Sequence, residues 1–523
     1  MYRANWLRLS VAACLVALLA GSAGADVRLA AVFSDHMVLQ RGCPVPVWGW
    51  AAPGQKVTVT VAGKKAEATA DAGGRWKAEL PALEAGGPHT LVVTGAGGNP
   101  VTVNDVLVGE VWLASGQSNM NMPIDWGVFG KWGSPECTEA LAKIDDPELR
   151  MFLVGMKVSP KPAKDVSGVW KVAKGNEVLK WSAVGYFFGA ELRRELGVPV
   201  GIVKSAVGGT VIESWMSREA LLKVSPDLQA SFDRWDRQVA EFDEAAHQKK
   251  VAEWEQEAAK AKAEGKRPPR RPVRATEHNR MPASLYNGMI APLVPYGLRG
   301  MLWYQGESNA GSAGTYAQRF PAMIRQWRKQ WGQGDVPFLF VQLPNFRKPQ
   351  TEPSQDADAW PWLREAQAAA LRLPAIGMAV AIDIGDAADI HPTNKLDVGR
   401  RLALAAMQTA YGKDVVGCGP LYESMKVEGH GVRVRFAHTG GGLAARGGGP
   451  LKGFAVAGAD HKFVWADAAI DGDSVVVRSA EVAEPVAVRY AWADNPVCNL
   501  VNAEGLPAAP FRTDPWPRAG GGN

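Results

Sequence analysis

The sequence predicts an α/β protein in which a parallel β-sheet is covered by helices on both faces and flanked by a β-sandwich module at each end. In the middle of the chain, near-continuous apolar runs alternate with helix-like segments, as in a parallel sheet buried on both faces. At the two ends, short alternating runs are punctuated by Gly and Pro, as in all-β modules. A chain of 523 residues is too long for one hydrophobic core, so several domains are expected.

The first 25 residues indicate a secretory signal peptide. Arg3 and Arg8 are followed by an apolar stretch from Leu9 to Ala20, and Ala23-Gly24-Ala25 supplies an A-x-A cleavage site. The apolar stretch is shorter than the roughly 20 residues that span a bilayer. We therefore expect a secreted or periplasmic protein without a membrane span, whose mature chain begins at Asp26.

Residues 26–104 and 415–523 are expected to form the two β-sandwich modules. Val57–Val61 alternates between apolar and polar residues in the first module, as Val432–Phe436 does in the second, and Thr90–Thr94 is a further short strand-like run in the first. Such alternation is typical of strands with one buried face.

Residues 105–414 are expected to form the α/β domain. Its candidate strands are Val106–Leu113, Val198–Ser205, Leu298–Tyr304, Pro337–Leu343 and Ile376–Ile382. Helical patterns lie between or after them, at Tyr316–Trp331, Leu363–Leu373 and Lys395–Tyr411. In a parallel sheet, ligands bind beyond the carboxyl ends of the strands.

A charged helical insertion is expected near residues 218–280. Its Glu and Lys spacing suits an exposed helix, and the basic run Lys266–Arg274 follows it. This run contributes to a formal net charge of +5. Because it has neither interleaved aromatic residues nor a nucleic-acid-binding motif, we interpret it as a solvated linker and expect no nucleic-acid partner.

The cysteines and histidines give no sign of a metal site or cofactor. Removal of the signal peptide leaves Cys43, Cys137, Cys418 and Cys498, which allow three disulfide pairings, with buried free thiols as the alternative. No C-x-x-C or H-x-x-x-H spacing occurs, which disfavours zinc or redox chemistry.

Four polar clusters come after four of the candidate strands. Parallel strands bring their carboxyl ends to one edge, so we expect these clusters to meet there. They are Gly116-Gln117-Ser118-Asn119-Met120, Gly208-Gly209-Thr210, Gln305-Gly306-Glu307-Ser308-Asn309 and Asp389-Ile390-His391-Pro392.

Ser118 and His391 are the candidate nucleophile and base. A serine beside glycine after a strand is exposed by a tight turn, which suits nucleophilic attack, although a helix-capping serine has the same local sequence. No G-x-S-x-G elbow is present, which disfavours a lipase-type hydrolase. Of the eight histidines, only His391 lies in a polar cluster beyond the end of a candidate core strand, with Asp389 two residues before it and Pro392 after it.

The chain resembles the SGNH hydrolase superfamily, with its flavodoxin-like sheet, and within it the sialate O-acetylesterase family. The resemblance covers nearly the whole mature chain and rests on ordered motifs. They are Met37-Val38-Leu39-Gln40-Arg41, Gly49-Trp50, Gly109-Glu110-Val111-Trp112, the four clusters above, Glu213-Ser214-Trp215, Asn287-Gly288-Met289-Ile290-Ala291-Pro292, Trp303-Tyr304 and Gly505-Leu506-Pro507-Ala508.

This resemblance implies a serine esterase that removes O-acetyl groups from a sugar through an acetyl-enzyme on Ser118. The oxyanion would bind the backbone N–H groups of Ser118 and Gly209 and a side-chain amide, with Gln305 as the first choice and Asn309 as the second. The residues expected to contact the substrate are Gln117, Asn119, Trp215, Glu307 and Asn309.

The acid of the triad is left open by the sequence. Many SGNH enzymes place an Asp three residues before the His, but Ala388 occupies that position here. Asp389, two residues before His391, is therefore expected to orient the imidazole. Glu307 and Asp386 are alternatives, as is a Ser-His dyad.

Two other functions are compatible with the same motifs. An esterase for acetylxylan or another polysaccharide would use identical chemistry. A carbohydrate-binding protein with an inactive centre would use Trp215, Trp303 and Trp360 as stacking platforms, although buried packing is the commoner fate of Trp. The sequence leaves open the sugar, the acetylated position and the oligomeric state.

Overall fold

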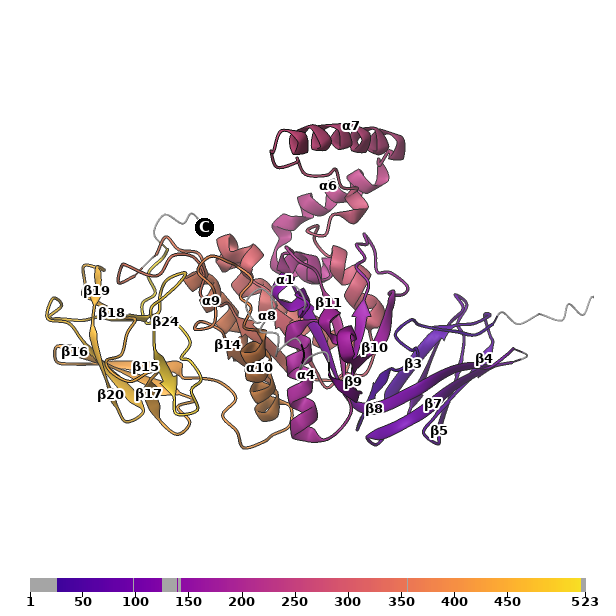
Figure 1. Cartoon of the computed structure of the whole chain (residues 1–523), viewed down its shortest axis with the longest axis horizontal. Coiled ribbons are helices and arrows are strands. Elements are labelled where there is room, and N and C mark those ends of the chain that lie inside the picture. The colour runs from indigo at the N-terminus through magenta and orange to yellow at the C-terminus, as the bar shows by residue number, and fades with distance from the viewer. Residues whose placement is uncertain (1–25, 97, 125–138, 140–142, 355, 519–523) are drawn as a thin grey trace, which may run out of the picture.

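The computed structural model describes residues 26–96, 98–124, 139, 143–354 and 356–518, so the expected signal peptide lies outside the described residues. Figure 1 shows an N-terminal β region, a central α/β region and a C-terminal β region arranged along the long axis. In the described part of the chain, no helix has the length and apolar character needed to cross a membrane.

Six parallel strands form the centre of the main sheet, with one antiparallel strand at the edge. Five of the parallel strands are those predicted from the sequence, and in chain order they lie as 2-1-3-4-5, one of the two common orders of doubly wound sheets. Across the sheet, the strands are β10 (Gly168–Lys174), β9 (Asp145–Val154), β11 (Val200–Ala206), β8 (Val101–Gly116), β12 (Gly300–Tyr304), β13 (Phe338–Gln342) and β14 (Ile376–Val380).

The sheet is mixed, whereas the sequence predicts a parallel one. β10 pairs antiparallel with β9 and its residues vary between buried and exposed, because an edge strand need not be covered on both faces. Neither β9 nor β10 is predicted from the sequence.

Strand β8 joins the N-terminal β region to the central sheet. Its first part pairs antiparallel with β7 (Gly86–Gly95), and its last part pairs parallel with β11 and β12. Its residues are buried without interruption from Val106 onward. Position 104, where the sequence suggests a domain boundary, thus falls within a continuous strand.

The remaining N-terminal strands lie in two sheets. A three-stranded sheet is separate, and the other strands extend the main sheet through β8. The first comprises β1 (Arg28–Leu29), β3 (Val45–Trp50) and β6 (Arg75–Leu80), and the second includes β2 (Val38–Gln40), β4 (Lys56–Val61) and β5 (Lys64–Thr69).

Helices cover both faces of the central sheet, as predicted. On one face α4 packs against α10, so closely that a Cβ on Gly399 would lie 2.6 Å from the Cβ of Phe187. On the other face α8 packs against α9. The four helices are α4 (Ala183–Leu196), α8 (Ala313–Trp331), α9 (Trp360–Ala368) and α10 (Lys395–Thr409).

Two tryptophans show that these helix pairs lie on opposite faces. Trp112 of β8 lies over Gly300 of β12 and contacts Phe188 of α4. Trp303 follows Gly300 by three residues on the same strand, so its side chain points to the other face, where it contacts Phe320 of α8.

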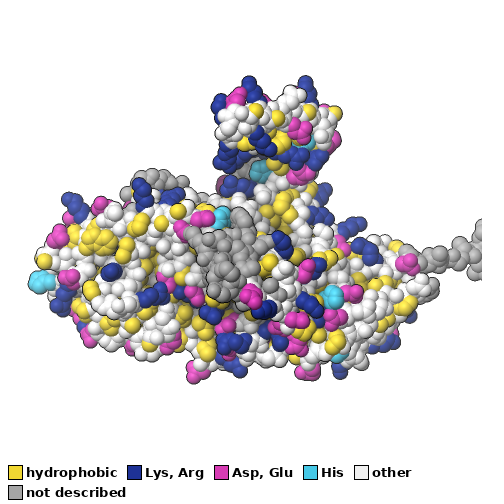
Figure 2. Space-filling view, in the orientation of Figure 1, with side chains coloured by type: hydrophobic (Ala, Val, Ile, Leu, Met, Phe, Trp, Pro, Cys, Tyr) yellow, Lys and Arg dark blue, Asp and Glu magenta, His cyan; other side chains and the backbone are white. Residues whose placement is uncertain are grey.

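The charged insertion projects from the α/β region as α6 (Gln229–Ala240) and α7 (Glu244–Ala263), after the short helix α5 (Arg218–Val224) (Figure 1). Figure 2 shows Lys and Arg side chains over much of this projection. In α7 only Val251 and Ala258 are buried, as expected of a solvated helix.

The C-terminal region consists of two four-stranded sheets and a two-stranded one. The larger sheets pack together through Tyr422 and Phe436 on one side and Phe511 on the other. Their strands are β15 (Leu421–Glu428), β16 (Gly431–Ala437), β21 (Ser474–Arg478) and β20 (Asp467–Asp471), then β19 (Phe463–Trp465), β18 (Phe454–Ala457), β22 (Ala487–Tyr490) and β24 (Phe511–Arg512), while β17 (Leu443–Ala445) pairs with β23 (Leu500–Asn502).

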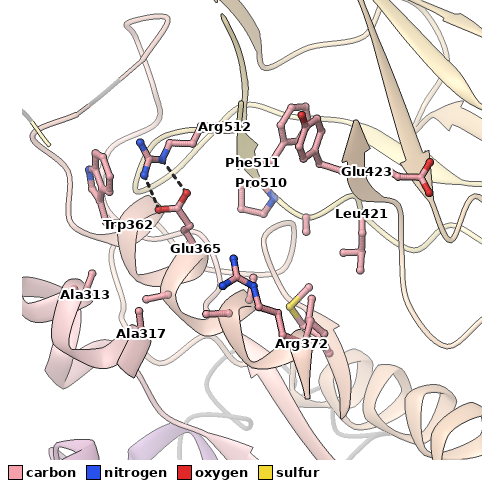
Figure 3. A pocket seen from close by; sticks show the side chains of 18 of the residues that line it. Ala313, Ala317, Trp362, Glu365, Arg372, Leu421, Glu423, Pro510, Phe511 and Arg512 are labelled. Atoms are coloured by element: carbon pink, nitrogen blue, oxygen red, sulfur yellow. Dashed lines mark hydrogen bonds and ion pairs between the residues drawn. The ribbon is translucent and has the colours of Figure 1, made fainter. Parts of the chain in front are cut away.

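A groove of about 920 Å³ separates this region from α8 and α9. Figure 3 shows Arg512 of β24 reaching across it to the carboxylate of Glu365 in α9, at 2.8 Å. None of the predicted site residues lines the groove.

Cys43, Cys418 and Cys498 are free thiols, so no two of these three form a disulfide. Cys137 lies outside the described residues.

Candidate active site

Ser118 lies where β8 and β12 end side by side. It begins the short helix α1 (Ser118–Asn121) directly after β8. Gly116 has a φ of 136°, and a Cβ there would lie 2.2 Å from the carbonyl oxygen of Tyr304. Only glycine fits this close approach, which lets β8 turn sharply into the helix that carries Ser118.

His391 lies in the loop between β14 and α10, and its Nε2 is 2.8 Å from Oγ of Ser118. The two residues are 273 positions apart in sequence. The strand ends therefore bring together a hydroxyl and an imidazole at hydrogen-bond distance, the arrangement of a nucleophile with its general base.

The surroundings of His391 favour the neutral imidazole. Burial lowers the pKa of His391 and the charge of Lys395 acts in the same direction, whereas Asp389 raises this pKa. A neutral Nε2 can accept a hydrogen bond from the Ser118 hydroxyl, which is the protonation state that a general base requires.

Asp389 lies beside the other nitrogen of His391. Its Oδ1 is 3.4 Å from Nδ1 and also accepts the backbone N–H of His391 at 2.8 Å. The Asp389 side chain is 58% exposed. Asp386 lies further back in the loop, where its Oδ1 accepts the backbone N–H groups of Ala388 and Asp389.

The glycines after β11 lie against Ser118. A Cβ on Gly208 would be 3.5 Å from the Cβ of Ser118. Gly209 has a φ of 71° and is exposed, and its N–H makes no hydrogen bond to any residue that the structure describes. This N–H is therefore unpaired among the described residues, and it belongs to the residue directly after the glycine that contacts Ser118.

Gln305 does not offer the free amide expected of an oxyanion donor. It is fully buried, and its amide nitrogen donates to the carbonyl of Thr210 at 3.2 Å and to Oδ1 of Asn309 at 2.7 Å. Both amide hydrogens are used. Asn309 donates one amide hydrogen to Glu213, at 3.1 Å, which leaves the other hydrogen available.

Trp215, expected at the sugar, is fully buried instead. Its indole N–H donates to Oγ1 of Thr210, and its ring packs edge-on against Trp303. Trp303 and Trp360 are buried as well. Because burial removes these apolar rings from water, none of them presents a face to a sugar.

Gln117 is buried, and within the described part of the chain it uses only one end of its side-chain amide. Its Oε1 accepts the backbone N–H groups of Gly306 and Ser308, at 3.4 and 3.3 Å. The amide nitrogen of Gln117 has no hydrogen-bond partner among the described residues.

Asn119 and Glu307, also expected to contact substrate, belong to a buried network with Lys395. The Asn119 amide donates to the Glu307 carboxylate, and Nζ of Lys395 donates to Oδ1 of Asn119 at 2.7 Å. Burial raises the pKa of Glu307 and lowers that of Lys395 to about 7. Sequence reasoning missed Lys395, although a lysine on an otherwise apolar helix face, four residues after the candidate base, is a signal.

Comparisons with known proteins identify the family of this chain. A family model described as "Carbohydrate esterase, sialic acid-specific acetylesterase" matches residues 274–408, which include Glu307 and His391. Sialate O-acetylesterase from Mus musculus is 32% identical over 451 residues, 79% of each chain. The chain belongs to the sialate O-acetylesterase family. The resemblance seen in the motifs is thereby confirmed, and the protein is a carboxylic ester hydrolase.

Further members of the sialate O-acetylesterase family and a solved structure match over nearly the whole length. Sialate O-acetylesterase from Rattus norvegicus is 30% identical, covering 95% of this chain and 96% of the relative. The crystal structure of a carbohydrate acetylesterase from Xanthomonas citri is 42% identical, with a TM-score of 0.78, covering 94% of this chain and all of that one.

Proposed function

We propose that this family member is a serine esterase that removes O-acetyl groups from sugars, with Ser118 as nucleophile and an SGNH-type arrangement of the site. The observation that carries the proposal is the 2.8 Å contact between Nε2 of His391 and Oγ of Ser118. The strand order 2-1-3-4-5 supports the SGNH-type, flavodoxin-like arrangement. Ser118 lies between β8 and β12, where the order of the strands reverses and ligands bind.

The reaction proceeds through an acetyl-enzyme. His391 takes the hydroxyl proton as Ser118 Oγ attacks the acetyl carbonyl, and a tetrahedral oxyanion forms. The C–O bond to the sugar then breaks, and the sugar oxygen takes the proton from His391. Water, deprotonated by His391, attacks the acetyl-Ser118 ester, and acetate leaves as Ser118 regains its proton.

The oxyanion binds the backbone N–H groups of Ser118 and Gly209. The free N–H of Gly209 and the close approach of Gly208 to Ser118 support this role. Each such donor stabilises the transition state by about 3 to 4 kcal/mol. Asn309, which keeps one unused amide hydrogen, is a better third donor than Gln305.

Asp389 stabilises the imidazolium that forms when His391 takes the proton. Its carboxylate lies 3.4 Å from Nδ1 and carries the compensating charge. Gln117, whose amide nitrogen is unpaired among the described residues, contacts the sugar or its acetyl group.

The substrate is an O-acetylated sugar, and the names of the curated relatives favour sialic acid. Acetylxylan or another polysaccharide is the second candidate, because the relative from Xanthomonas citri is named only as a carbohydrate acetylesterase. The N-terminal sequence supports a signal peptide at 1–25 and a secreted or periplasmic enzyme.

Two measurements test this function. Acetate release from a panel of O-acetylated sialic acids and acetylated xylo-oligosaccharides identifies the sugar. If acetate is released from neither group of substrates, the proposed sugar esterase activity is contradicted. A serine-directed phosphonate should inactivate the enzyme and label the peptide that contains Ser118. Inactivation with the label on another serine would contradict the proposed nucleophile.

A further inference from the structure

A buried hydrogen-bond network connects the residue after Ser118 to the peptide groups on both sides of His391. The amide nitrogen of Asn119 donates to the carbonyl of Ile390 at 3.1 Å. Nζ of Lys395 donates to Oδ1 of Asn119 at 2.7 Å and also to the carbonyl of Pro392. The carbonyl of Ile390 is thus bound directly to the side-chain amide of Asn119. The carbonyl of Pro392 is bound to the same amide through the ammonium group of Lys395.

Lys395 is the cationic member of this network and has no exposed surface. Its counter-charge is Glu307, which accepts a hydrogen bond from the other end of the Asn119 amide. The ring of Tyr304 lies 5.7 Å from Nζ. Removing two charges from water is costly, and well-packed apolar residues often serve stability equally well. Stability alone therefore does not account for a fully buried lysine at this position.

We propose that Lys395 is a positioning residue of the esterase: through Asn119 it holds the loop that carries His391 at the distance from Ser118 that proton transfer requires. This inference rests on the proposed roles of Ser118 and His391. Lys395 does not touch the reacting atoms, because its hydrogen bonds go to Asn119 and to the carbonyl of Pro392.

The charge of Lys395 also acts on His391. Asp389 in the same loop, Lys395 from α10 and Ser118 from α1 face the imidazole, while Glu307 faces Lys395. Lys395 lowers the pKa of His391, so its removal raises that pKa and the base form is reached only at higher pH. The acid limb of the kcat/KM profile should then move to higher pH, a change that a purely structural role of Lys395 would not produce.

Lys395→Met is best measured in a Glu307→Gln background. The single variant leaves the Glu307 carboxylate buried without its counter-charge, which alone destabilises a protein. Glu307→Gln keeps an acceptor for Asn119, so the comparison between the double variant and Glu307→Gln isolates the ammonium of Lys395. Arg400→Met, which removes an exposed cation from the same helix, is the matched control.

Two substrates separate positioning from sugar binding. A chromogenic acetate ester has no sugar, so a positioning defect should lower kcat/KM for it and for the acetylated sugar by the same factor. A misplacement of about 1 Å costs on the order of a hundredfold. We expect kcat/KM of the double variant to fall by about that factor relative to Glu307→Gln, and the acid limb of its pH profile to move to higher pH. Arg400→Met should keep the parental kcat/KM.

An unchanged kcat/KM in the double variant would overturn the proposal. So would a loss confined to the sugar substrate, or a loss that follows the melting temperature while the acid limb stays in place. If Ser118→Ala keeps its activity, the proposed catalytic mechanism fails. If Ser118→Ala is inactive and the Lys395 comparison shows no loss, only the positioning role fails.

Discussion

Replacing Asp389 by Asn removes a negative charge from beside His391 while leaving the local turn intact. Oδ1 of Asp389 accepts the backbone N–H of His391 at 2.8 Å, and the amide oxygen of Asn accepts the same hydrogen bond. The variant should therefore fold with a parental melting temperature. Its effect on turnover reports the interaction of the carboxylate with the imidazolium.

The size of that interaction follows from the 3.4 Å between Oδ1 and Nδ1. At this separation, two unit charges attract by about 1 kcal/mol in water and by about 5 kcal/mol at the effective dielectric constant of a protein surface. Because the Asp389 side chain is 58% exposed, the effect should lie near the lower figure. A loss of about 1 to 2 kcal/mol of transition-state stabilisation lowers kcat about five- to thirtyfold.

Turnover and melting temperature measured on the same Asp389→Asn preparation test this reasoning. Unchanged turnover would remove Asp389 from the mechanism and indicate a Ser-His dyad. A loss of about 10⁴, as in the best-studied triad, would show that the carboxylate acts in a much less solvated setting than its exposure implies.

Three further predictions concern the site and its support. Ser118→Ala and His391→Ala should each abolish most turnover, and the double variant should be no worse than either, since the two act as one unit; additive losses in kcat would show that they act separately. Because burial lowers the pKa of His391, kcat/KM should fall with decreasing pH only below about 6.5, the ordinary His value; an acid limb above it contradicts the assigned environment. Trp215→Ala should lower the free energy of unfolding in urea by about 3 to 5 kcal/mol, as for other buried Trp; a stable variant with a raised KM for the sugar would instead place this ring at the substrate.

The central strands were predictable because burial on both faces leaves unbroken apolar runs in the sequence. Gly300–Tyr304 and Phe338–Gln342 are buried at every position and were found. The edge strand Gly168–Lys174 mixes exposed and buried residues and was missed. β8 runs through position 104 and pairs with strands of both the N-terminal and the central region. Because the sequence of one continuous strand does not show which strands it pairs with, this shared strand was also not predictable.

The site was predictable in position but not in orientation. Ser118 and His391 follow from the rule that parallel strands end at one edge. Whether a side chain at that edge faces the ligand or the core depends on packing from distant elements. Gln305 and Trp215 both turn to Thr210, and Lys395 reaches Asn119 across more than 270 positions of sequence.

The central claim is that Ser118 carries the acetyl group during hydrolysis. Acetate release from the preferred acetylated sugar, measured for the parent, Ser118→Ala and Ser217→Ala, tests it most directly. The Ser217 side chain caps the N-terminus of α5 and is not part of the candidate site. Ser217→Ala therefore controls for the loss of a serine hydroxyl from the same domain. We expect parental release by Ser217→Ala and none above background by Ser118→Ala, with both variants folded. Release by folded Ser118→Ala at a rate near that of the parent would contradict it.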